Sequence, residues 1–313
     1  MKILVTGGTG MVGSSLVRKL LALKNKHTVT IFARHAEPGM NATFVEGDIT
    51  DAAQLEKAFP VDVVFHLAAA INDTNDAWKI NVEGTRNVVD LCKKHGVKQL
   101  IHMSSCTVMG ATTVASEDAS YAPSNTLYSR SKVEAEKFVL DSGLRYTVIR
   151  APVIIGPSRN ILSIMKAAKS KYPIIGSGQN RFHTACVDDV TDLMLKTVGN
   201  EKAIGQVFNV AVTDVPTYLE FYKMLCEELG VEMTQKHLPL WLVKLVARVH
   251  TAVSKLKGKE PKVTMSPTAI DQLTRDRVIP IEKVQAVLGW KPKYTTRQAL
   301  AETIKAFREQ GNL

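Results

Sequence analysis

The sequence predicts an α/β protein in which helices cover both faces of a doubly wound parallel sheet. Short β-rich runs alternate with stretches of helical periodicity through the first half of the chain, and the links between them are short. A glycine-rich turn joins the first run to the first helical stretch. Such alternation is typical of βαβ units with right-handed crossovers. The 313 residues suffice for one large domain or two interlocked ones.

The predicted elements follow one another from residue 2 to residue 150. The expected strands are residues 2–6, 28–33, 43–46, 61–66, 98–103 and 146–150. The expected helices of this half are residues 11–23, 75–95 and 125–142. After Arg150 proline and glycine cluster and helices predominate, although a strand near residues 207–210 is expected to return to the main sheet.

The glycine-rich turn has the spacing G-x-x-G-x-x-G and opens the first helix. The chemistry needs glycine there, because the turn is tight and the backbone must approach a pyrophosphate closely. The free N–H groups and the positive dipole at the helix N-terminus attract phosphates. In a strand–turn–helix context this predicts a Rossmann-type dinucleotide site, although a glycine-rich turn alone is often only a turn. The residues expected to touch the cofactor here are Gly7, Gly10, Met11, Val12 and Gly13.

The change of pattern after Arg150 predicts two parts with separate roles. We expect a dinucleotide-binding Rossmann domain over residues 1–155, with a returning segment near residues 186–212. A smaller, mainly helical C-terminal substrate lobe is expected over residues 156–185 and 213–313.

The end of the second strand bears on which nicotinamide cofactor is used. An acidic side chain there would bind the adenosine ribose of NAD, but this chain has Ala33 followed by Arg34. A guanidinium can hold a 2′-phosphate in bidentate fashion and stack on adenine. The pattern favours NADP(H). NAD(H) stays an alternative, since Arg34 could be a solvated loop residue and Glu37 could serve NAD if the loop folds back.

Two further strand ends are expected to contact the cofactor. Asp48 and Ile49 follow the third strand, where Asp48 either accepts a hydrogen bond from the adenine amino group or caps the next helix. Residues 67–69 follow the fourth strand, and small side chains there would let the backbone lie against the cofactor. The residues expected to do so are Leu67, Ala68 and Ala69, while His66 before them is expected to be structural.

A candidate catalytic pair lies at the start of the helix predicted over residues 125–142. Tyr128 and Lys132 are four residues apart, so the phenol and the ammonium can point into one site. A free tyrosine has a pKa of about 10, and a nearby lysine together with an oxidised nicotinamide would favour the phenolate. Ser105 ends the fifth strand upstream, where α/β sheets place ligands, and could hydrogen-bond the substrate oxygen.

Asn81 in the preceding long helix is a further candidate. Its amide could hold a water for Lys132 or fix the bend behind Ser105, and it could equally be a simple helix-bend residue.

Together the motifs resemble the extended short-chain dehydrogenase/reductase superfamily, also called the NAD-dependent epimerase/dehydratase family. In order, they are TGGTGMVG at 6–13, GDITD at 47–51, HLAAA at 66–70, NVEGT at 81–85, SSCTVMG at 104–110, YSRSK at 128–132, RAPVIIGP at 150–157, CVDDV at 186–190 and LGWKP at 288–292. The resemblance implies a triad of Ser105, Tyr128 and Lys132. It also implies that residues 150–154 approach the nicotinamide, which adds Ala151 and Val153 to the cofactor contacts beside Tyr128 and Lys132.

Departures from the family pattern bear on the substrate. Many sugar-nucleotide members carry asparagine where this chain has Val153, and Arg-x-Gly-Asp where it has Arg275, Asp276 and Arg277. The tail looks more like the hydroxysteroid dehydrogenase and dihydroflavonol reductase branch. This favours hydride transfer between NADP(H) and a secondary alcohol or ketone, with Tyr128 as acid/base. The alternative is a sugar-nucleotide epimerase or dehydratase with tightly bound NAD(P).

Three residues are candidates for contact with this small-molecule substrate, namely Cys106, Thr107 and His183. Asp189 is expected to cap a helix that starts at Val190. A non-catalytic protein of the same fold is disfavoured because the tyrosine and the lysine are both present.

Composition excludes several other classes of protein. The formal net charge is +10, but the basic residues are scattered without the aromatic interleaving of a nucleic-acid face. The histidines are dispersed, so no metal is indicated. The four cysteines, Cys92, Cys106, Cys186 and Cys226, are widely spaced and fit free thiols in a reducing compartment. With no signal-like segment and no apolar run of membrane-spanning length, a cytoplasmic location is expected.

Residues 239–257 form an amphipathic pattern with one apolar and one basic side. The apolar positions are Trp241, Leu242, Leu245, Val246, Val249, Val253 and Leu256, and the basic ones are Lys244, Arg248, Lys255 and Lys257. Such a helix could touch a membrane surface, cover an apolar pocket or, more commonly, pack on its own domain. The family resemblance further implies a homodimer formed by paired helices, including the one with Tyr128.

Overall fold

The centre of the molecule is a seven-stranded, all-parallel sheet in a computed structural model that describes residues 1–23, 27–36, 39–71, 75–110, 112–256 and 267–313. Its strands are β1 (Lys2–Thr6), β2 (Thr28–Ala33), β3 (Thr43–Glu46), β4 (Val63–His66), β5 (Gln99–Ser105), β6 (Tyr146–Ala151) and β10 (Gln206–Asn209). Their spatial order is β10-β6-β5-β4-β1-β2-β3. The order reverses between β1 and β4, and in open α/β sheets ligands bind outside the carboxyl ends of the strands at such a point.

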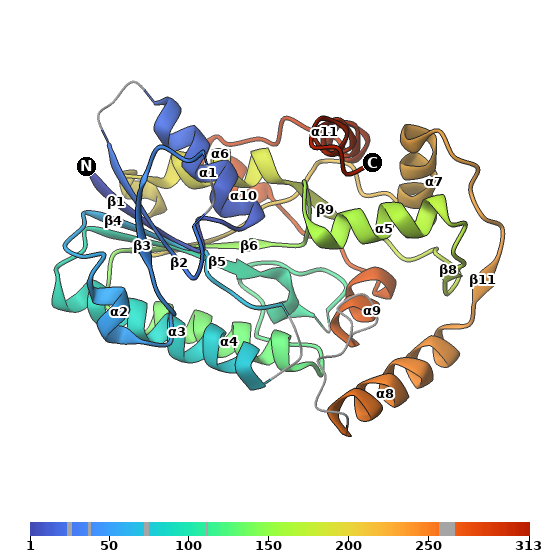
Figure 1. Ribbon diagram of the computed structural model, residues 1–313, viewed down its shortest axis with the longest axis horizontal. Helices are drawn as coiled ribbons and strands as arrows, with labels where there is room; N and C mark the ends of the chain where they lie inside the picture. The colour runs from blue at the N-terminus through green and yellow to red at the C-terminus, as the bar shows by residue number, and fades with distance from the viewer. Residues whose placement is uncertain (24–26, 37–38, 72–74, 111, 257–266) are drawn as a thin grey trace.

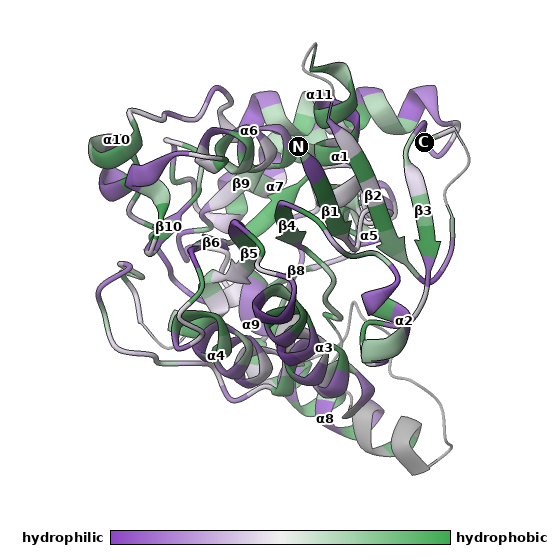
Figure 2. Ribbon diagram, turned by 90° about the vertical axis from the view of Figure 1, so that its left-hand side faces the viewer, coloured by the Kyte–Doolittle hydropathy of each residue, from purple (hydrophilic) through white to green (hydrophobic). Residues whose placement is uncertain are grey.

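Helices cover both faces of this sheet (Figure 1). On one face lie α1 (Met11–Ala22) and α6 (Val187–Thr197), and on the other α2 (Ala52–Glu56), α3 (Asn75–Lys94) and α4 (Leu127–Leu140). Successive side chains of a strand point to opposite faces. Ile3 and Val5 of β1 therefore share a core with Leu16 of α1, whereas Leu4 packs in the core that holds Val88 of α3. Figure 2 shows the hydrophobic strands between helices with hydrophilic outer sides.

The second half of the chain builds a second layer of helices beside the sheet. Its strands are β7 (Val153–Ile155), β8 (Ile174–Ile175), β9 (Thr184–Cys186) and β11 (His237–Leu238), and its 3₁₀ turn is η2 (Glu201–Ala203). Its remaining helices are α5 (Arg159–Lys169), α7 (Tyr218–Leu229), α8 (Leu240–Leu256), α9 (Pro267–Thr274), α10 (Glu282–Leu288) and α11 (Thr296–Glu309). The helices α5, α7 and α11 share a core that contains Ile161, Phe221 and Leu300.

The strand expected near residues 207–210 is β10, which pairs in parallel with β6. The expected boundaries of the dinucleotide-binding part enclose all seven strands of the sheet. The expectation for Asp189 is wrong, because α6 already begins at Val187 and the carboxylate instead accepts hydrogen bonds from the Lys293 and Tyr294 amides, at 2.8 and 3.2 Å. That contact links α6 to the chain before α11.

The four cysteines are buried free thiols. Among the described residues, no cluster of His, Cys, Asp and Glu has the arrangement of a metal site. None of the helices in the described part of the chain has the length and apolar character needed to cross a membrane.

Candidate active site

The glycine turn lies against the chain that follows β4. Gly7 has a φ of +69°, and a Cβ atom there would stand 2.7 Å from the Ala68 amide nitrogen. A Cβ atom at Gly13 would stand 2.2 Å from the Gly7 carbonyl oxygen. Only glycine fits both positions. Gly10 precedes α1 as its N-cap and has no side chain that could cap the first turn. The turn and the uncapped amides fit a pyrophosphate group.

Arg34 and Asp48 lie at the ends of neighbouring strands. Arg34 follows β2 and is exposed. The Asp48 Oδ1 atom accepts hydrogen bonds from the Thr50 amide and hydroxyl, at 2.9 and 2.8 Å. The hydrogen bond from the Thr50 amide contributes most to the lowered pKa of Asp48, and the positive charge of Arg34 lowers this pKa further. Glu37 lies outside the described residues.

The alternative in which Asp48 caps the next helix is wrong. Asp51 is the N-cap of α2 and accepts from the amides of Ala53 and Gln54 at 2.9 and 3.0 Å. Asp48 instead stabilises the turn at Ile49 and Thr50 through its Oδ1 atom. Its other carboxylate oxygen is the group that could contact an adenine.

The end of β4 is held by polar side chains from two directions. The His66 ring contacts the Thr6 hydroxyl at 2.8 Å and the Thr85 hydroxyl at 2.9 Å. Burial lowers the pKa of His66 to about 3. The Thr6 hydroxyl also accepts from the Ala68 amide at 3.3 Å. His66 is therefore structural, as the sequence predicted, and it fixes the backbone of residues 67–69 opposite the glycine turn.

The structure brings Ser105, Tyr128 and Lys132 together where α4 packs on β5. The Thr126 hydroxyl caps α4 by accepting from the Ser129 amide at 3.1 Å, which sets the start of the helix. Tyr128, in the first turn, is hydrogen-bonded to Ser105 at the end of β5. Lys132, one turn later, donates from Nζ to the Met103 carbonyl oxygen at 2.7 Å.

Burial governs the charges of this group. It raises the pKa of Tyr128, an effect that the hydrogen bond with Ser105 opposes. It also lowers the pKa of Lys132 to about 8. The two shifts have one cause, since the phenolate and the ammonium both lose hydration. That Lys132 and an oxidised nicotinamide together favour the Tyr128 phenolate stays a prediction.

Asn81 connects three elements below this group. Its Oδ1 atom accepts from the Ala70 amide at 2.8 Å, and its Nδ2 atom donates to the Ala70 carbonyl oxygen and the Ser131 hydroxyl, both at 2.9 Å. It thus ties α3 to the chain after β4 and to α4, beside Lys132. These bonds fit a residue that positions its neighbours.

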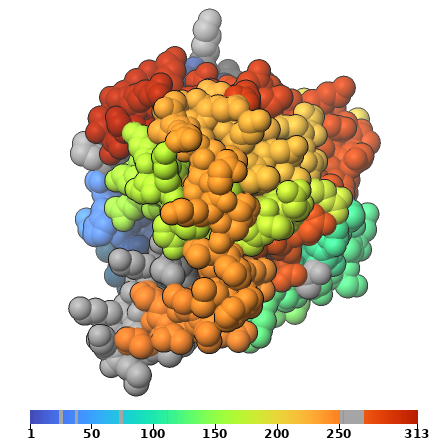
Figure 3. Space-filling model, turned by 90° about the vertical axis from the view of Figure 1, so that its right-hand side faces the viewer, coloured from blue at the N-terminus to red at the C-terminus, as the bar shows by residue number. Residues whose placement is uncertain are grey.

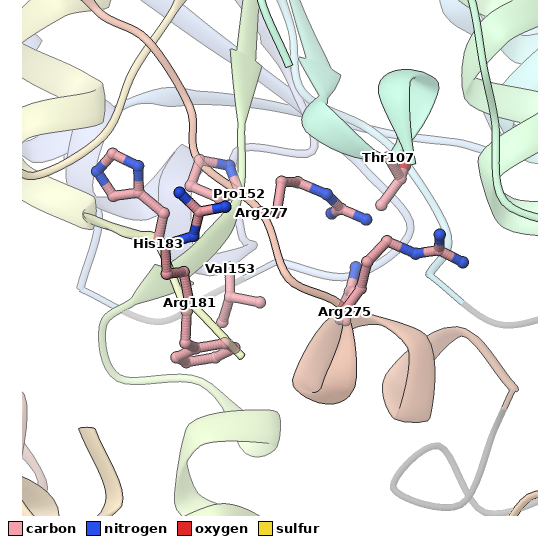
Figure 4. A pocket seen from close by; sticks show the side chains of 9 residues that line it. Thr107, Pro152, Val153, Arg181, His183, Arg275 and Arg277 are labelled. Carbon is pink, nitrogen blue, oxygen red and sulfur yellow. The ribbon is translucent and has the colours of Figure 1, made fainter. Parts of the chain in front are cut away.

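A pocket opens between η1 (Cys106–Met109) and the second half of the chain (Figure 4). Its lining residues are Thr107, Pro152, Val153, Arg181, Phe182, His183, Gln272, Arg275 and Arg277. The Thr107 hydroxyl donates to the Ser105 hydroxyl oxygen at 3.0 Å, so the pocket adjoins the Ser105–Tyr128 pair. Val153, expected near the cofactor, forms part of this wall, while Ala151 ends β6 and pairs with Ser105.

The three predicted substrate residues differ in their surroundings. Thr107 lines the pocket with its side chain. His183 also lines it, but both ring nitrogens are engaged, Nε2 with the Val212 carbonyl oxygen at 2.6 Å and Nδ1 with the Ile279 amide at 3.0 Å. Cys106 is buried away from the lining, and burial raises the pKa of its thiol to about 12. His183 can therefore offer the edge of its ring but no further hydrogen bond.

Three arginines give the pocket its charge. Arg181 pairs in bidentate fashion with Asp276, at 2.9 and 2.7 Å, and Arg275 pairs with Asp271. Arg277 is only 8 % exposed and donates to the Gly110 carbonyl oxygen at 3.0 Å. Its Nε atom has no partner among the described residues.

Sequence reasoning missed Gln272, Arg275 and Arg277 as pocket residues. In the sequence, Arg275 and Arg277 stand out only as a departure from a family motif. The available signal was the pair of arginines itself, since two guanidiniums so close together need counter-charges or an anionic ligand.

Comparisons with known proteins agree with this geometry. The sequence pattern described as the NAD dependent epimerase/dehydratase family matches residues 3–211. A 3beta-hydroxysteroid-dehydrogenase/decarboxylase isoform 1 from Arabidopsis thaliana is 30 % identical, over 97 % of this chain and 79 % of that protein. A UDP-glucose 4-epimerase from Vibrio cholerae is also 30 % identical, over 99 % of this chain and 96 % of that protein.

Solved structures share the fold over the full length. A UDP-glucose 4-epimerase from Thermotoga maritima with UDP-glucose superposes with a TM-score of 0.79 at 24 % identity, covering 99 % of both chains. A UDP-glucuronic acid 4-epimerase from Bacillus cereus in complex with NAD superposes with a TM-score of 0.78 at 21 % identity, also covering 99 % of both chains. At these identities the structures establish the fold alone.

Proposed function

Since the chain belongs to the NAD-dependent epimerase/dehydratase family, and is thus an enzyme of the dehydrogenase/epimerase class, we propose that it transfers hydride between NADP(H) and a secondary alcohol or ketone. The observation that carries this proposal is the convergence of Ser105, Tyr128 and Lys132 where α4 packs on β5. The site lies at the carboxyl end of β5, on the same edge of the parallel sheet as the glycine turn that follows β1, with β4 between the two strands.

The cofactor contacts we propose lie along this edge of the sheet. Gly7, Gly10, Met11, Val12 and Gly13 would surround the pyrophosphate, and Arg34 would hold a 2′-phosphate. Asp48 and Ile49 would face the adenine, and the backbone of Leu67, Ala68 and Ala69 would lie along the cofactor. Ala151 and Val153 would flank the nicotinamide together with Tyr128 and Lys132. NAD(H) is the alternative cofactor.

A bound nicotinamide supplies the carbon that accepts or donates the hydride. In reduction, Ser105 would hold the substrate carbonyl oxygen, and Tyr128 would give that oxygen its phenolic proton and become a phenolate. In oxidation the Tyr128 phenolate would take the proton of the substrate hydroxyl. The raised pKa of Tyr128 keeps the phenol protonated at neutral pH, which suits the reductive direction. The Met103 carbonyl oxygen holds Lys132 beside Ser105 and Tyr128. Asn81 positions the start of α4 through its hydrogen bond to Ser131.

An apolar, non-nucleotide substrate is favoured by two observations. Val153 stands in the pocket wall where a polar side chain would serve a nucleotide. Several relatives are named as hydroxysteroid dehydrogenases or, in Mus musculus, as a sterol-4-alpha-carboxylate 3-dehydrogenase. We propose that Thr107 contacts the substrate beside Ser105, with the ring of His183 forming part of the wall and Cys106 packing behind.

A second candidate is a sugar-nucleotide epimerase or dehydratase with tightly bound NAD(P). The cluster of Arg181, Arg275 and Arg277 favours it, because guanidiniums suit the charge and geometry of a diphosphate. One relative is named as a UDP-glucose 4-epimerase. The two candidates differ in cofactor turnover, since only the first consumes NADPH.

The test is a turnover assay with NADPH and NADH against bulky apolar ketones and against UDP-sugars, comparing wild type with Tyr128→Phe. We expect NADPH consumption with a ketone, a loss of at least about 100-fold in the variant, and nearly unchanged NADPH binding. Tyr172→Phe, at an exposed tyrosine, is the matched control. Turnover retained by Tyr128→Phe would remove this residue from the mechanism, and epimerisation of a UDP-sugar without net NADPH loss would favour the second candidate.

We also propose a homodimer formed through α3 and α4, which pack on each other and form one outer layer of the molecule. A reducing, cytoplasmic compartment is proposed because all four cysteines are buried free thiols.

A further inference from the structure

The helix α8 carries an apolar face that the described part of the chain leaves exposed. Six of the twelve exposed large hydrophobic side chains among the described residues belong to this helix. They are Trp241, Leu242, Leu245, Val246, Val249 and Val253, with exposed fractions from 36 % to 68 %. The other six are scattered over other parts of the surface. Isolated exposed apolar residues are ordinary, but a contiguous group marks an interaction surface.

The helix has a second apolar side that is already occupied. Val243 and Ala247 are buried and pack with Ile270 of α9. At about 100° per residue the six exposed side chains span an arc of about 140°, roughly opposite this buried side. The helix therefore packs on its own domain, but through Val243 and Ala247 and not through the apolar positions that the sequence pattern names. Figure 1 shows α8 at the margin of the molecule, next to α9.

Positive charge borders the exposed face. Lys244 and Arg248 are both exposed and lie along the edge next to Trp241. Residues 240–256 contain no Asp or Glu, and the whole chain has a formal net charge of +10. An apolar face with a basic border is complementary to a surface that is apolar inside and anionic outside.

We propose that α8 lies on an anionic lipid bilayer, with Trp241, Leu245 and Val249 inserted among the acyl chains and Lys244 and Arg248 at the lipid phosphates. The helix has 17 residues and is about 25 Å long. Because two exposed charged residues lie near its middle, the helix is suited to lying in the plane of the membrane–water interface and not to crossing the membrane. In Figure 3 the orange segment that includes α8 runs along the lower part of this face of the molecule, open to the outside.

A second copy of the chain is a poorer occupant for the same face. A symmetric contact would place the same patch on both subunits. The basic edges of two α8 helices would then lie close together, and no acidic side chain of residues 240–256 could neutralise them.

Docking would bring the candidate substrate pocket close to the bilayer. α8 packs on α9, and Gln272 of α9 and Arg275 directly after it line that pocket. An apolar substrate dissolved in the membrane would thus be concentrated near the lobe that is proposed to bind it. This consequence depends on the proposed function, whereas the docking itself does not.

The experiment is cosedimentation of the full chain with vesicles of phosphatidylcholine alone and with 30 % phosphatidylserine, a fraction of roughly the anionic content of a cytoplasmic leaflet. We expect binding to the anionic vesicles that weakens with salt. Leu245→Asp/Val249→Asp should abolish it. Lys244→Gln/Arg248→Gln should weaken it roughly 20-fold, about fivefold for each charge removed. Tyr172→Asp, at an exposed aromatic residue outside α8, is the matched control and should bind as wild type.

The controls separate docking from folding and from activity. Near-UV circular dichroism and NADPH binding should be the same for all variants, because none of the changed residues lies in the candidate active site. Equal binding of the Leu245→Asp/Val249→Asp variant and wild type would overturn the proposal. So would concentration-dependent self-association of wild type that this variant abolishes, since a second copy would then cover the face. Loss of ketone turnover with vesicle binding intact would count only against the proposed function.

Discussion

His102 in β5 is a buried histidine near the candidate site. Its ring lies 5.1 Å from that of His66, and neither of its nitrogens has a partner among the described residues. Burial lowers the pKa of both histidines, and the charge of Lys132 adds to the effect. A neutral imidazole pair next to a buried lysine is therefore part of the folded state.

The burial of these two histidines predicts that the folded protein loses stability in acid. Because the folded pKa values lie below the unfolded value of about 6.5, the unfolded chain binds more protons below that pH, and stability falls as pH falls. Each buried histidine adds a slope of about 1.4 kcal/mol per pH unit there. His102→Leu should remove one such contribution from the slope between pH 6 and pH 4, measured by urea unfolding. His35→Gln, at an exposed histidine, should leave the slope unchanged. An unchanged slope in His102→Leu would show that His102 titrates normally.

The proposed cofactor preference depends on one residue, Arg34. Arg34 is exposed at the end of β2, and its charge reaches Asp48. If it holds a 2′-phosphate, Arg34→Ala should weaken NADPH binding about 10- to 100-fold, the value of a charge-assisted hydrogen bond of ~1.5–3 kcal/mol, and NADH binding far less. Titration followed by nicotinamide fluorescence measures both. Equal losses for the two cofactors would contradict the NADP(H) assignment.

At the scale of elements, one buried carboxylate joins β5, α4 and β6. Glu136 of α4 accepts from Arg150 of β6, with 2.6 Å from the guanidinium to Oε1, and from the Tyr121 hydroxyl at 2.9 Å. It also accepts from the Ser104 hydroxyl of β5. Both charged side chains are almost fully buried. The network holds α4, with Tyr128 and Lys132, in register with the end of β5.

Breaking this pair should be costly. Glu136→Gln would leave the Arg150 guanidinium buried without a counter-charge, and we expect a loss of ~3–5 kcal/mol in the free energy of unfolding. Glu134→Gln, which removes an exposed pair with Lys137 on the same helix, should cost less than ~0.5 kcal/mol. Chemical denaturation of the two variants gives the comparison. Equal losses would mean that the buried pair has no special role in stability.

At the scale of the whole molecule, α3 and α4 form an outer layer with a charged surface. The Arg86 guanidinium of α3 stands 4.7 Å from the centre of the Phe138 ring of α4. No exposed large hydrophobic side chain lies on either helix. An interface built here would therefore be polar and depend on such contacts.

The proposed dimer can be tested at that contact. We expect a sedimenting mass of twice the 34.4 kDa chain. Arg86→Glu should weaken the dimer at least about tenfold, because it reverses a charge on this layer and removes the Arg86–Phe138 contact that joins α3 and α4 within each subunit. Leu245→Asp/Val249→Asp on α8 should leave the mass unchanged. A monomeric wild type would refute the dimer.

Much of the fold was predictable from local pattern. The predicted strands and helices of the first half correspond to observed elements with shifted ends, such as β4, which begins at Val63 and not at residue 61. Glycine at 7 and 13 was predictable because a close backbone approach excludes a Cβ atom at those positions. That Tyr128 and Lys132 lie on one face of a helix follows from their spacing of four residues.

What the sequence determined by itself is thus the order of the elements, the glycine turn and the one-turn spacing of tyrosine and lysine, because each depends on residues close together in the chain. Only the tertiary structure decided that Arg181, Arg275 and Arg277 meet beside Thr107, that Asp189 bonds the chain before α11, and which apolar side of α8 is buried. Such contacts join segments that are far apart in the chain: the numbers of Asp189 and Lys293 differ by 104, and those of Gly110 and Arg277 by 167. Their partners are chosen by how whole elements pack, which no local periodicity encodes.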